Sequence, residues 1–232
     1  MTMNGRRAYA AEALGTALLL ATVVGSGIMA ERLSPANPGV ALLANAVATG
    51  AILYVLIVGF GPLSGAHFNP VVTLIEVALR RMPAARAPGY LVAQLVGAYA
   101  GVLLAHAMFN EPLLQVSHHV RDSGGEIVGE VVATFGLWLV IALTGRAHSA
   151  AVPAAVALYI VGAYWFTSST SFANPAVSVA RAFTDTFAGI RPADLAHFIP
   201  AQLVGGAAAA AFTAWLLPNS CVHPAPPPSL PA

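Results

Sequence analysis

The sequence carries very little charge. Only 8% of its 232 residues are charged, whereas 58% are hydrophobic. A soluble domain usually has about a quarter charged residues, so this chain lacks the polar surface that a soluble protein of its size needs. It contains no lysine, and its ten arginines nearly balance nine acidic residues. That near-zero net charge argues against a nucleic-acid-binding protein, and the composition indicates a membrane protein.

Cysteine and catalytic motifs are also scarce. The single cysteine, Cys221, excludes a disulfide within the chain. There is no His-Glu-x-x-His motif, no Gly-x-Ser-x-Gly motif and no pair of carboxylates placed for a shared cleft. The adjacent His118 and His119 are weak evidence for a metal site. We therefore expect neither an enzyme nor a resident metal or cofactor.

Six apolar segments are long enough to cross a bilayer, which takes roughly 20 mostly apolar residues. They cover about residues 8–29, 40–60, 88–109, 126–145, 151–168 and 195–217. The basic start of the chain resembles a signal peptide, but Glu12 interrupts its apolar run and many spans follow, so we interpret it as an uncleaved first span. The proline-rich tail, residues 218–232, is expected to be disordered.

Two further stretches, residues 62–81 and 169–190, are too apolar for aqueous loops. Glycine, proline and asparagine interrupt both, so neither spans the bilayer alone. The sequence therefore predicts an all-α membrane protein with six transmembrane helices and two re-entrant segments.

Three short motifs recur in the same order in the two halves of the chain. Residues 11–16, 69–73 and 93–97 correspond to residues 129–134, 174–178 and 201–205. Each half, about residues 8–115 and 125–217, holds three spans, and an odd number of spans reverses the direction of insertion. The second copy is thus expected upside down relative to the first, and interrupted segments at matching positions mark the binding site of such inverted repeats.

Arginine positions favour a cytoplasmic N-terminus. With that orientation the inner loops hold six arginines and the outer loops four, which agrees with the positive-inside rule. Because the number of spans is even, the C-terminus is expected to be cytoplasmic too.

Each re-entrant segment contains an Asn-Pro pair at an equivalent place. Asparagine is a good N-cap, and proline suits the first helical turn, so a short helix should begin after Asn69 and after Asn174. Non-helical backbone at membrane depth is tolerated where protein buries it or where it lines a water-filled cavity. Two such loops would bring both amides and both positive helix ends together near the midplane, where they favour neutral hydrogen-bonding solutes and oppose cations and protons. A third pair, Asn37-Pro38, reads as a turn.

Residues 64–70 (Ser-Gly-Ala-His-Phe-Asn-Pro) and 172–176 (Phe-Ala-Asn-Pro-Ala) resemble the two signature loops of the aquaporin and aquaglyceroporin family, also called the major intrinsic proteins. The likeness extends from Glu12 to Leu217. It implies that residues 1–232 form a single transmembrane channel domain with a pore in every subunit and a homotetrameric assembly. The motif positions are Asn69, Pro70, Val71, Asn174, Pro175 and Ala176.

The resemblance also locates a selectivity filter by its offsets from the two asparagines. The four positions are Thr49, Gly162, Ser171 and Val177. The water-selective branch of the family has an aromatic residue at the first and histidine at the second, and most members have arginine at the fourth; this chain has none of them. Without bulky groups and without a fixed guanidinium, the ring should be wide and suit hydroxylated neutral solutes such as glycerol, urea or arsenous acid. The alternative is that the offsets slip by a residue, above all at Thr49.

Arg181 lies one helical turn beyond Val177. It could serve as a vestibule charge that attracts anions. The alternative, which we favour from the sequence, is that it faces headgroups or water or pairs with Asp185.

Val177 together with residues 180–190 resembles a bacterial subgroup, the AqpS-type aquaglyceroporins associated with arsenic-resistance operons. This implies a channel in the inner membrane that lets arsenite, and methylated arsenicals, leave the cell down their gradient. A wide ring alone does not distinguish arsenic from glycerol, so a plain water or glycerol channel is the alternative. Whether weak anions also pass stays open.

Glu12 and Glu130 lie inside spans at matching repeat positions. Such carboxylates are functional by default, and a proton relay through them would make the protein a proton-coupled transporter. The resemblance implies instead that each accepts hydrogen bonds from a re-entrant loop. His67 is expected to support its loop in the same way, with a proton-sensitive gate as the alternative.

Overall fold

The computed structural model describes residues 5–217, which form helices and connecting loops without a β-strand. The helices are α1 (Gly5–Leu33), α2 (Pro38–Ser64), α3 (Pro70–Ala78), α4 (Ala87–Phe109), α5 (Gly124–Ala147), α6 (Val152–Phe166), α7 (Pro175–Arg181) and α8 (Leu195–Leu216). Single 3₁₀ turns lead into α4, α6 and α8 at Ala84–Arg86, Ser149–Ala151 and Pro192–Asp194. The expectations for Cys221 and for the tail, residues 218–232, lie outside the described residues.

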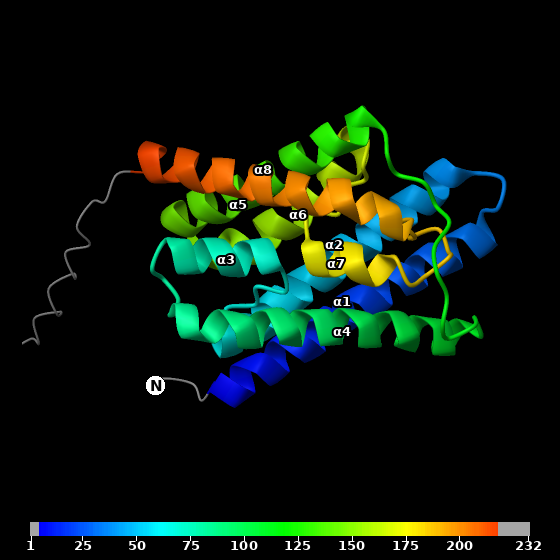
Figure 1. The fold of residues 1–232 in the computed structure, drawn as a ribbon, viewed down its shortest axis with the longest axis horizontal. Helices are drawn as coiled ribbons and strands as arrows, with labels where there is room; N and C mark the ends of the chain where they lie inside the picture. Colours follow the sequence, from blue (N-terminus) through cyan, green and yellow to red (C-terminus); the bar gives the residue numbers. More distant parts are fainter. Residues whose placement is uncertain (1–4, 218–232) are drawn as a thin grey trace, which may run out of the picture.

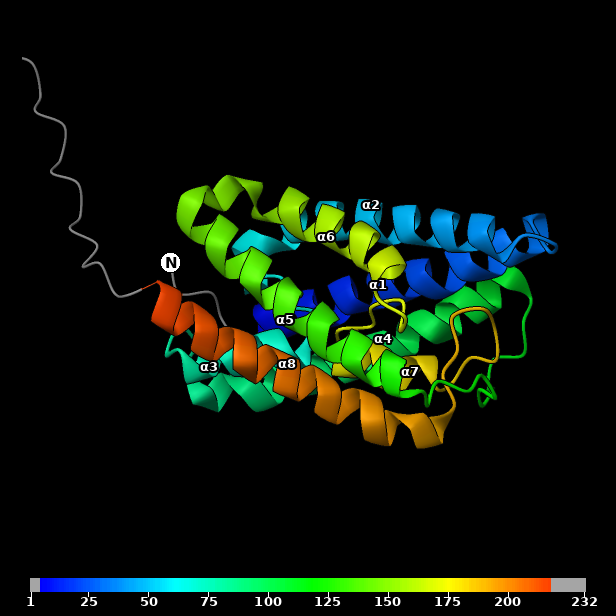
Figure 2. The same ribbon diagram turned by 90° about the horizontal axis from the view of Figure 1, so that it is seen from above.

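Six of the described helices, α1, α2, α4, α5, α6 and α8, are long and apolar enough to cross a membrane. They coincide with the six predicted spans, and α3 and α7 are the two predicted half-helices. In Figure 1, α3 and α7 follow one another along the long axis, between α8 on one side and α4 on the other, and both contact these two helices. In Figure 2, α2 and α6 lie together on the face opposite α8. The described chain begins and ends at the same end of the molecule (Figure 1), as an even number of spans requires.

Both half-helices begin as the sequence predicts. The Asn69 side chain accepts a hydrogen bond from the backbone N–H of Val71, and Pro70 occupies the first turn. The Asn174 side chain likewise accepts from the backbone N–H groups of Ala176 and Val177. The third Asn-Pro pair is also a cap, because Asn37 closes the start of α2.

Small residues set the distance between the paired long helices. A Cβ atom added at Gly97 of α4 would lie 2.2 Å from the carbonyl oxygen of Ala13 in α1, and one added at Gly205 of α8 would lie 2.3 Å from that of Val131 in α5. These two contacts are equivalent in the repeat. In a bilayer, helix association depends on such close packing rather than on the hydrophobic effect.

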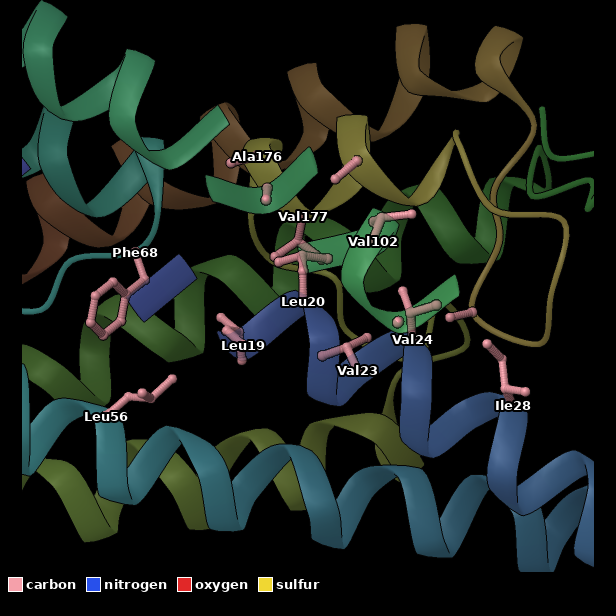
Figure 3. Close-up of a cluster of buried hydrophobic side chains, with 14 of the residues drawn as sticks. Leu19, Leu20, Val23, Val24, Ile28, Leu56, Phe68, Val102, Ala176 and Val177 are labelled. Carbon is pink, nitrogen blue, oxygen red and sulfur yellow. The ribbon is translucent and has the colours of Figure 1, made fainter. Parts of the chain in front are cut away.

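A cluster of buried apolar side chains joins the two halves of the chain (Figure 3). It includes Leu20, Val24 and Ile28 of α1, Val102 of α4 and Val177 of α7. In this cluster the second half-helix is packed against helices of the first repeat, which fixes the position of Val177.

Candidate functional site: a cavity between two re-entrant loops

The two loops that precede α3 and α7 have the same unusual backbone. Three positions in each adopt positive φ, at equivalent places before the asparagine: Gly65 (90°), Ala66 (51°), Phe68 (47°), Thr170 (60°), Ser171 (53°) and Ala173 (48°). For a residue other than glycine this conformation costs on the order of 1–3 kcal/mol and persists only where the surroundings hold it. Both loops are therefore held in place from outside.

Glu12 holds the first loop. Its carboxylate accepts hydrogen bonds from the backbone N–H groups of His67 (2.9 Å) and Phe68 (2.7 Å) and from the Ser64 hydroxyl (2.6 Å). The amide of Gln94, on α4, donates to it as well (2.8 Å).

Glu130 holds the second loop through the corresponding atoms. It accepts from the backbone N–H groups of Phe172 and Ala173, both at 2.9 Å, and from the amide of Gln202 at 2.6 Å. Glu12 and Glu130 are both fully buried. Each carboxylate thus satisfies the donors of its loop, and neither lines the cavity described below.

The two asparagines cross between the loops. Asn69 Nδ2 donates to the carbonyl oxygen of Ala173 (2.7 Å), and Asn174 Nδ2 donates to that of Phe68 (2.8 Å). An amide nitrogen has two hydrogens, so each asparagine keeps one donor in addition to this contact.

Both asparagines line a cavity of about 300 Å³. At one end its lining includes Glu76 and Val152, which we call the Glu76 end; at the other, which we call the Arg181 end, it includes Thr49, Tyr164 and Arg181. Of the four filter positions expected from sequence, Thr49, Ser171 and Val177 lie in the lining, and His67 does so as well. Most of the lining is apolar, with few polar groups between the two ends.

The expectation for Gly162 is wrong. This glycine is exposed and is not among the lining residues, no atom lies within 4 Å of a Cβ added to it, and Tyr164 lines the cavity instead. The lining residues of α6 follow a spacing of four: Val152, Val156, Ile160 and Tyr164. Gly162 is two residues before Tyr164, so it lies roughly 200° around the helix. The Tyr164 hydroxyl is 3.2 Å from that of Thr49, which narrows the Arg181 end.

The preferred expectation for Arg181 is also wrong. Its side chain faces neither headgroups nor Asp185: it is buried, it lines the cavity, and its guanidinium carbon lies 3.4 Å from the centre of the Phe172 ring. Its Nε donates to the carbonyl oxygen of Ala188. Asp185 instead accepts from the backbone and the ring of His118, and these hydrogen bonds lower the pKa of the Asp185 carboxyl. The cavity is thus lined by an arginine, although the four filter positions lack one.

A second guanidinium approaches the same ring. Arg121, in the loop between α4 and α5, places its guanidinium carbon 5.0 Å from the centre of the Phe172 ring. Its side chain donates to the carbonyl oxygens of Gly189 (2.9 Å) and Ser169 (3.4 Å). Burial is the main cause that lowers the pKa of Arg121 from its usual value. Sequence reasoning missed Arg121 and Phe172, because nothing in the local pattern of either segment brings them together.

His67 belongs to the first loop alone. Its Nδ1 lies 3.0 Å from the Thr73 hydroxyl, and its ring lies against that of Tyr90, with centres 5.1 Å apart. Tyr90 in turn donates to the carbonyl oxygen of Ser64 (2.7 Å). These contacts brace the loop, as the sequence reading prefers, while one edge of the ring still reaches the cavity.

Comparisons with known proteins agree with this geometry. Residues 1–167 match the profile of the family described as "Major intrinsic protein". The chain is 54% identical over 211 residues to "Aquaglyceroporin AqpS" of Rhizobium meliloti (strain 1021), with 91% of this chain and 90% of that protein covered. It is 30% identical over 226 residues to "Aquaporin Z" of Bradyrhizobium diazoefficiens, covering 90% of this chain and 92% of the relative. Among solved structures, the X-ray structure of the aquaglyceroporin from Plasmodium falciparum superposes with a TM-score of 0.69 at 21% identity, covering 90% of this chain and 95% of that one, which supports the fold.

Proposed function

Because the chain belongs to the major intrinsic protein family, we propose that its cavity passively conducts small neutral solutes, with arsenite and glycerol-like polyols as the principal ones. The protein is a multi-pass membrane channel of the aquaglyceroporin kind and not an enzyme. The observation that carries the proposal is that both asparagines, Thr49 and Val177 line one and the same cavity.

A passive channel agrees better with the geometry than a proton-coupled transporter. Glu12 and Glu130 are outside the cavity lining, and backbone N–H groups occupy both oxygens of each carboxylate. A proton relay needs a carboxylate that exchanges protons with the transport path. These two act as fixed acceptors for the loops.

The arsenite assignment rests on solute chemistry and on a relative. Arsenous acid is a small neutral molecule with hydroxyl groups, as glycerol is, and a largely apolar cavity with a few polar groups suits both. Val177, in the position where most of the family has arginine, gives the cavity a smaller and uncharged lining side chain. The relative at 54% identity is named "Aquaglyceroporin AqpS". The subgroup of that name is associated with arsenic, and we extend this association, methylated arsenicals included, to this chain.

A plain water and glycerol channel is the second candidate. Tyr164 and Arg181 both line the Arg181 end, and the Tyr164 hydroxyl approaches Thr49. These groups narrow a passage that the four offset positions alone would leave wide.

We further propose that the protein is a homotetramer in the bacterial inner membrane, with both termini in the cytoplasm. The arginine distribution supports this orientation. Large apolar side chains are exposed on the long helices, among them Val92, Val96 and Leu158, as lipid or subunit contacts require.

The test is solute influx into proteoliposomes, measured for arsenite, glycerol and water. Val177→Arg should lower arsenite influx at least about tenfold and leave water influx less affected, because a long guanidinium side chain would occupy part of the cavity that Val177 lines. Gly162→Ala is the matched control, since the added methyl group faces open space away from the cavity. Exclusion of arsenite by the native protein, with water still conducted, would favour the second candidate. Absence of all three fluxes would refute the channel proposal.

A further inference from the structure

We infer that Arg181 and Ser171 form a binding site for small oxyanions, of the carboxylate type, at the Arg181 end of the cavity. The inference depends on the proposed function only in assuming that solutes enter this cavity. Position 177, where most of the family has arginine, is a valine in this chain. We assign the specificity-determining positive charge to Arg181 instead.

The guanidinium of Arg181 is fixed but only partly used. The side chain is 3% exposed, one face of the guanidinium covers the Phe172 ring, and Nε donates to the carbonyl oxygen of Ala188. Within residues 5–217 the two terminal nitrogens of Arg181 have no hydrogen-bond partner, while the residue lines the cavity. An arginine carries five N–H donors in a rigid fork, so the donors best placed for bidentate binding remain available.

No carboxylate within residues 5–217 forms an ion pair with Arg181. The arginines Arg32, Arg81 and Arg191, which do form ion pairs, have side chains at least 39% exposed. The side chains of Arg181 and Arg121 donate to carbonyl oxygens and lie against the Phe172 ring, and the nearby Asp194 accepts from the backbone N–H of Arg121 and pairs with Arg191. A buried charge without a counter-ion is costly, and an ionisable group at membrane depth is a functional candidate by default. An anionic solute supplies the missing charge.

A second unpaired group belongs to Ser171, another residue of the cavity lining. The Ser171 side chain is 4% exposed, and within residues 5–217 its hydroxyl oxygen has no hydrogen-bond partner. The other two hydroxyls at this end, those of Thr49 and Tyr164, lie within hydrogen-bond distance of each other. The free donors are therefore the guanidinium fork and the Ser171 hydroxyl. They match a solute with two oxygens on one centre and a negative charge shared between them.

The carboxylates near the cavity do not compete with such a solute. Glu130 is fully buried behind the second loop, where Phe172 and Ala173 occupy its oxygens. Glu76 lines the opposite end and pairs with Arg81. The positive end of the cavity is thus separated from its acidic end by the two asparagines.

The experiment uses acetate as the probe and acetamide, its neutral counterpart of the same shape, as the reference. Two readouts are taken on the full chain: inhibition of glycerol influx into proteoliposomes, and the shift of the melting temperature in detergent. Acetate should inhibit and stabilise the native protein, and acetamide should do so far less. Arg181→Gln should raise the inhibition constant for acetate about tenfold, the size expected for loss of a charge-assisted hydrogen bond, with inhibition measured relative to the variant's own uninhibited glycerol influx. Arg181→Lys, which keeps the charge, should retain most of the effect.

Arg32→Gln is the matched control, because this exposed arginine pairs with Glu111 and does not line the cavity. Equal inhibition by acetate in the native protein and in Arg181→Gln would overturn the inference, as would an equal effect of acetamide. If Arg181→Gln does not fold, Ser171→Ala decides: its inhibition constant should rise about threefold, consistent with one neutral hydrogen bond, and no rise would refute the site. If the native protein conducts no glycerol, the proposed function fails, and the melting shift alone still tests the oxyanion site.

Discussion

The two re-entrant loops share a backbone but differ in the side chains that they expose. Ala66 and Phe68 have positive φ at the positions that Ser171 and Ala173 occupy in the second loop. Glu12 and Glu130 accept hydrogen bonds from equivalent backbone atoms. The backbone conformation of the loops and the glutamate contacts that hold it are therefore duplicated.

The side chains are not duplicated. Where the first loop carries His67, braced by Thr73 and Tyr90, the second carries Phe172 with an arginine over its ring. The first half-helix brings Glu76 into the cavity lining, and the second brings Arg181. The repeat thus supplies the backbone framework of the pore, whereas the chemistry at each end comes from one half only.

The largest expected effect tests whether the scaffold is equivalent in the two halves. Glu12→Ala and Glu130→Ala should each lower the free energy of unfolding by at least about 3 kcal/mol, because each leaves two buried backbone donors unpaired at roughly 1–3 kcal/mol apiece. Thermal unfolding in detergent measures this, with Glu31→Gln, an exposed residue of α1, as the control. A loss confined to one of the two variants would break the equivalence. The glutamine variants should be milder and, if folded, should keep a passive flux that ignores a pH gradient.

The second prediction concerns the close helix contacts at equivalent glycines. Gly97→Ala and Gly205→Ala each place a methyl group against a backbone carbonyl, so each should cost about 1–3 kcal/mol. Gly59→Ala is the matched control within a helix: no atom lies within 4 Å of the added Cβ. It should be neutral or stabilising by up to about 1 kcal/mol, because alanine favours the helix. Melting temperatures that fall equally in all three variants would contradict the packing argument.

The third prediction sharpens the difference between the halves. The hydroxyls of Thr73 and Ser178 each accept from a glutamine of the neighbouring span and donate to the preceding asparagine's carbonyl. Only Thr73 also meets His67. Thr73→Val should therefore lower the free energy of unfolding by about 1 kcal/mol more than Ser178→Ala does. Thr73→Ser, which keeps the hydroxyl, should recover that additional loss. Equal losses, measured by chemical or thermal unfolding, would mean that the His67 contact adds nothing.

The smallest expected effect is a pH dependence on the side of the second loop. Hydrogen bonds from the backbone and ring of His118 lower the pKa of Asp185 below its ordinary value of 3.8. A depressed carboxyl pKa stabilises the fold above the unfolded pKa, and that contribution is lost as the pH falls through the folded pKa. Stability should thus decline below about pH 4 in the native protein and less so in Asp185→Asn. Hydrogen exchange of the His118 amide reports the same loss of the Asp185 contact locally. A pH profile of stability that is identical in the two proteins would contradict the prediction.

The fold was predictable because a bilayer leaves few choices. Six apolar runs can only be spans, and backbone that breaks such a run must be buried or line a cavity. The Asn-Pro pairs then predicted the first residue of α3 and of α7 correctly. The odd number of spans in each repeat required the second repeat to be inverted.

The site was predictable where local chain geometry determines it. Ser171 and Val177 lie a few residues from Asn174, so their offsets could not slip, and both line the cavity. Gly162 is separated from that asparagine by the end of α6 and by a loop with positive φ angles. A fixed count of residues across this irregular segment did not predict which side of α6 faces the cavity. The lining residues of α6 recur every four positions from Val152, and this spacing leads to Tyr164.

Arg181 failed for a different reason. Its sequence neighbours offer Asp185, whereas its actual contacts are the ring of Phe172 and the carbonyl of Ala188. Neither contact follows from helical spacing, because both depend on how the loops on either side of α7 fold back. Tertiary packing decided the direction of this side chain.

The crossed hydrogen bonds of Asn69 and Asn174 have the form of a contact between two copies of one molecule. Asn69 bonds the residue before Asn174, and Asn174 bonds the residue before Asn69. This reciprocity, in which position i meets j and j meets i, is the signature of a twofold interface between identical subunits. Each half of the chain thus behaves as one protomer of a dimer, with the two protomers joined in a single polypeptide. Residues 1–115 and 116–232, expressed as separate chains, should therefore assemble around the same pair of asparagines.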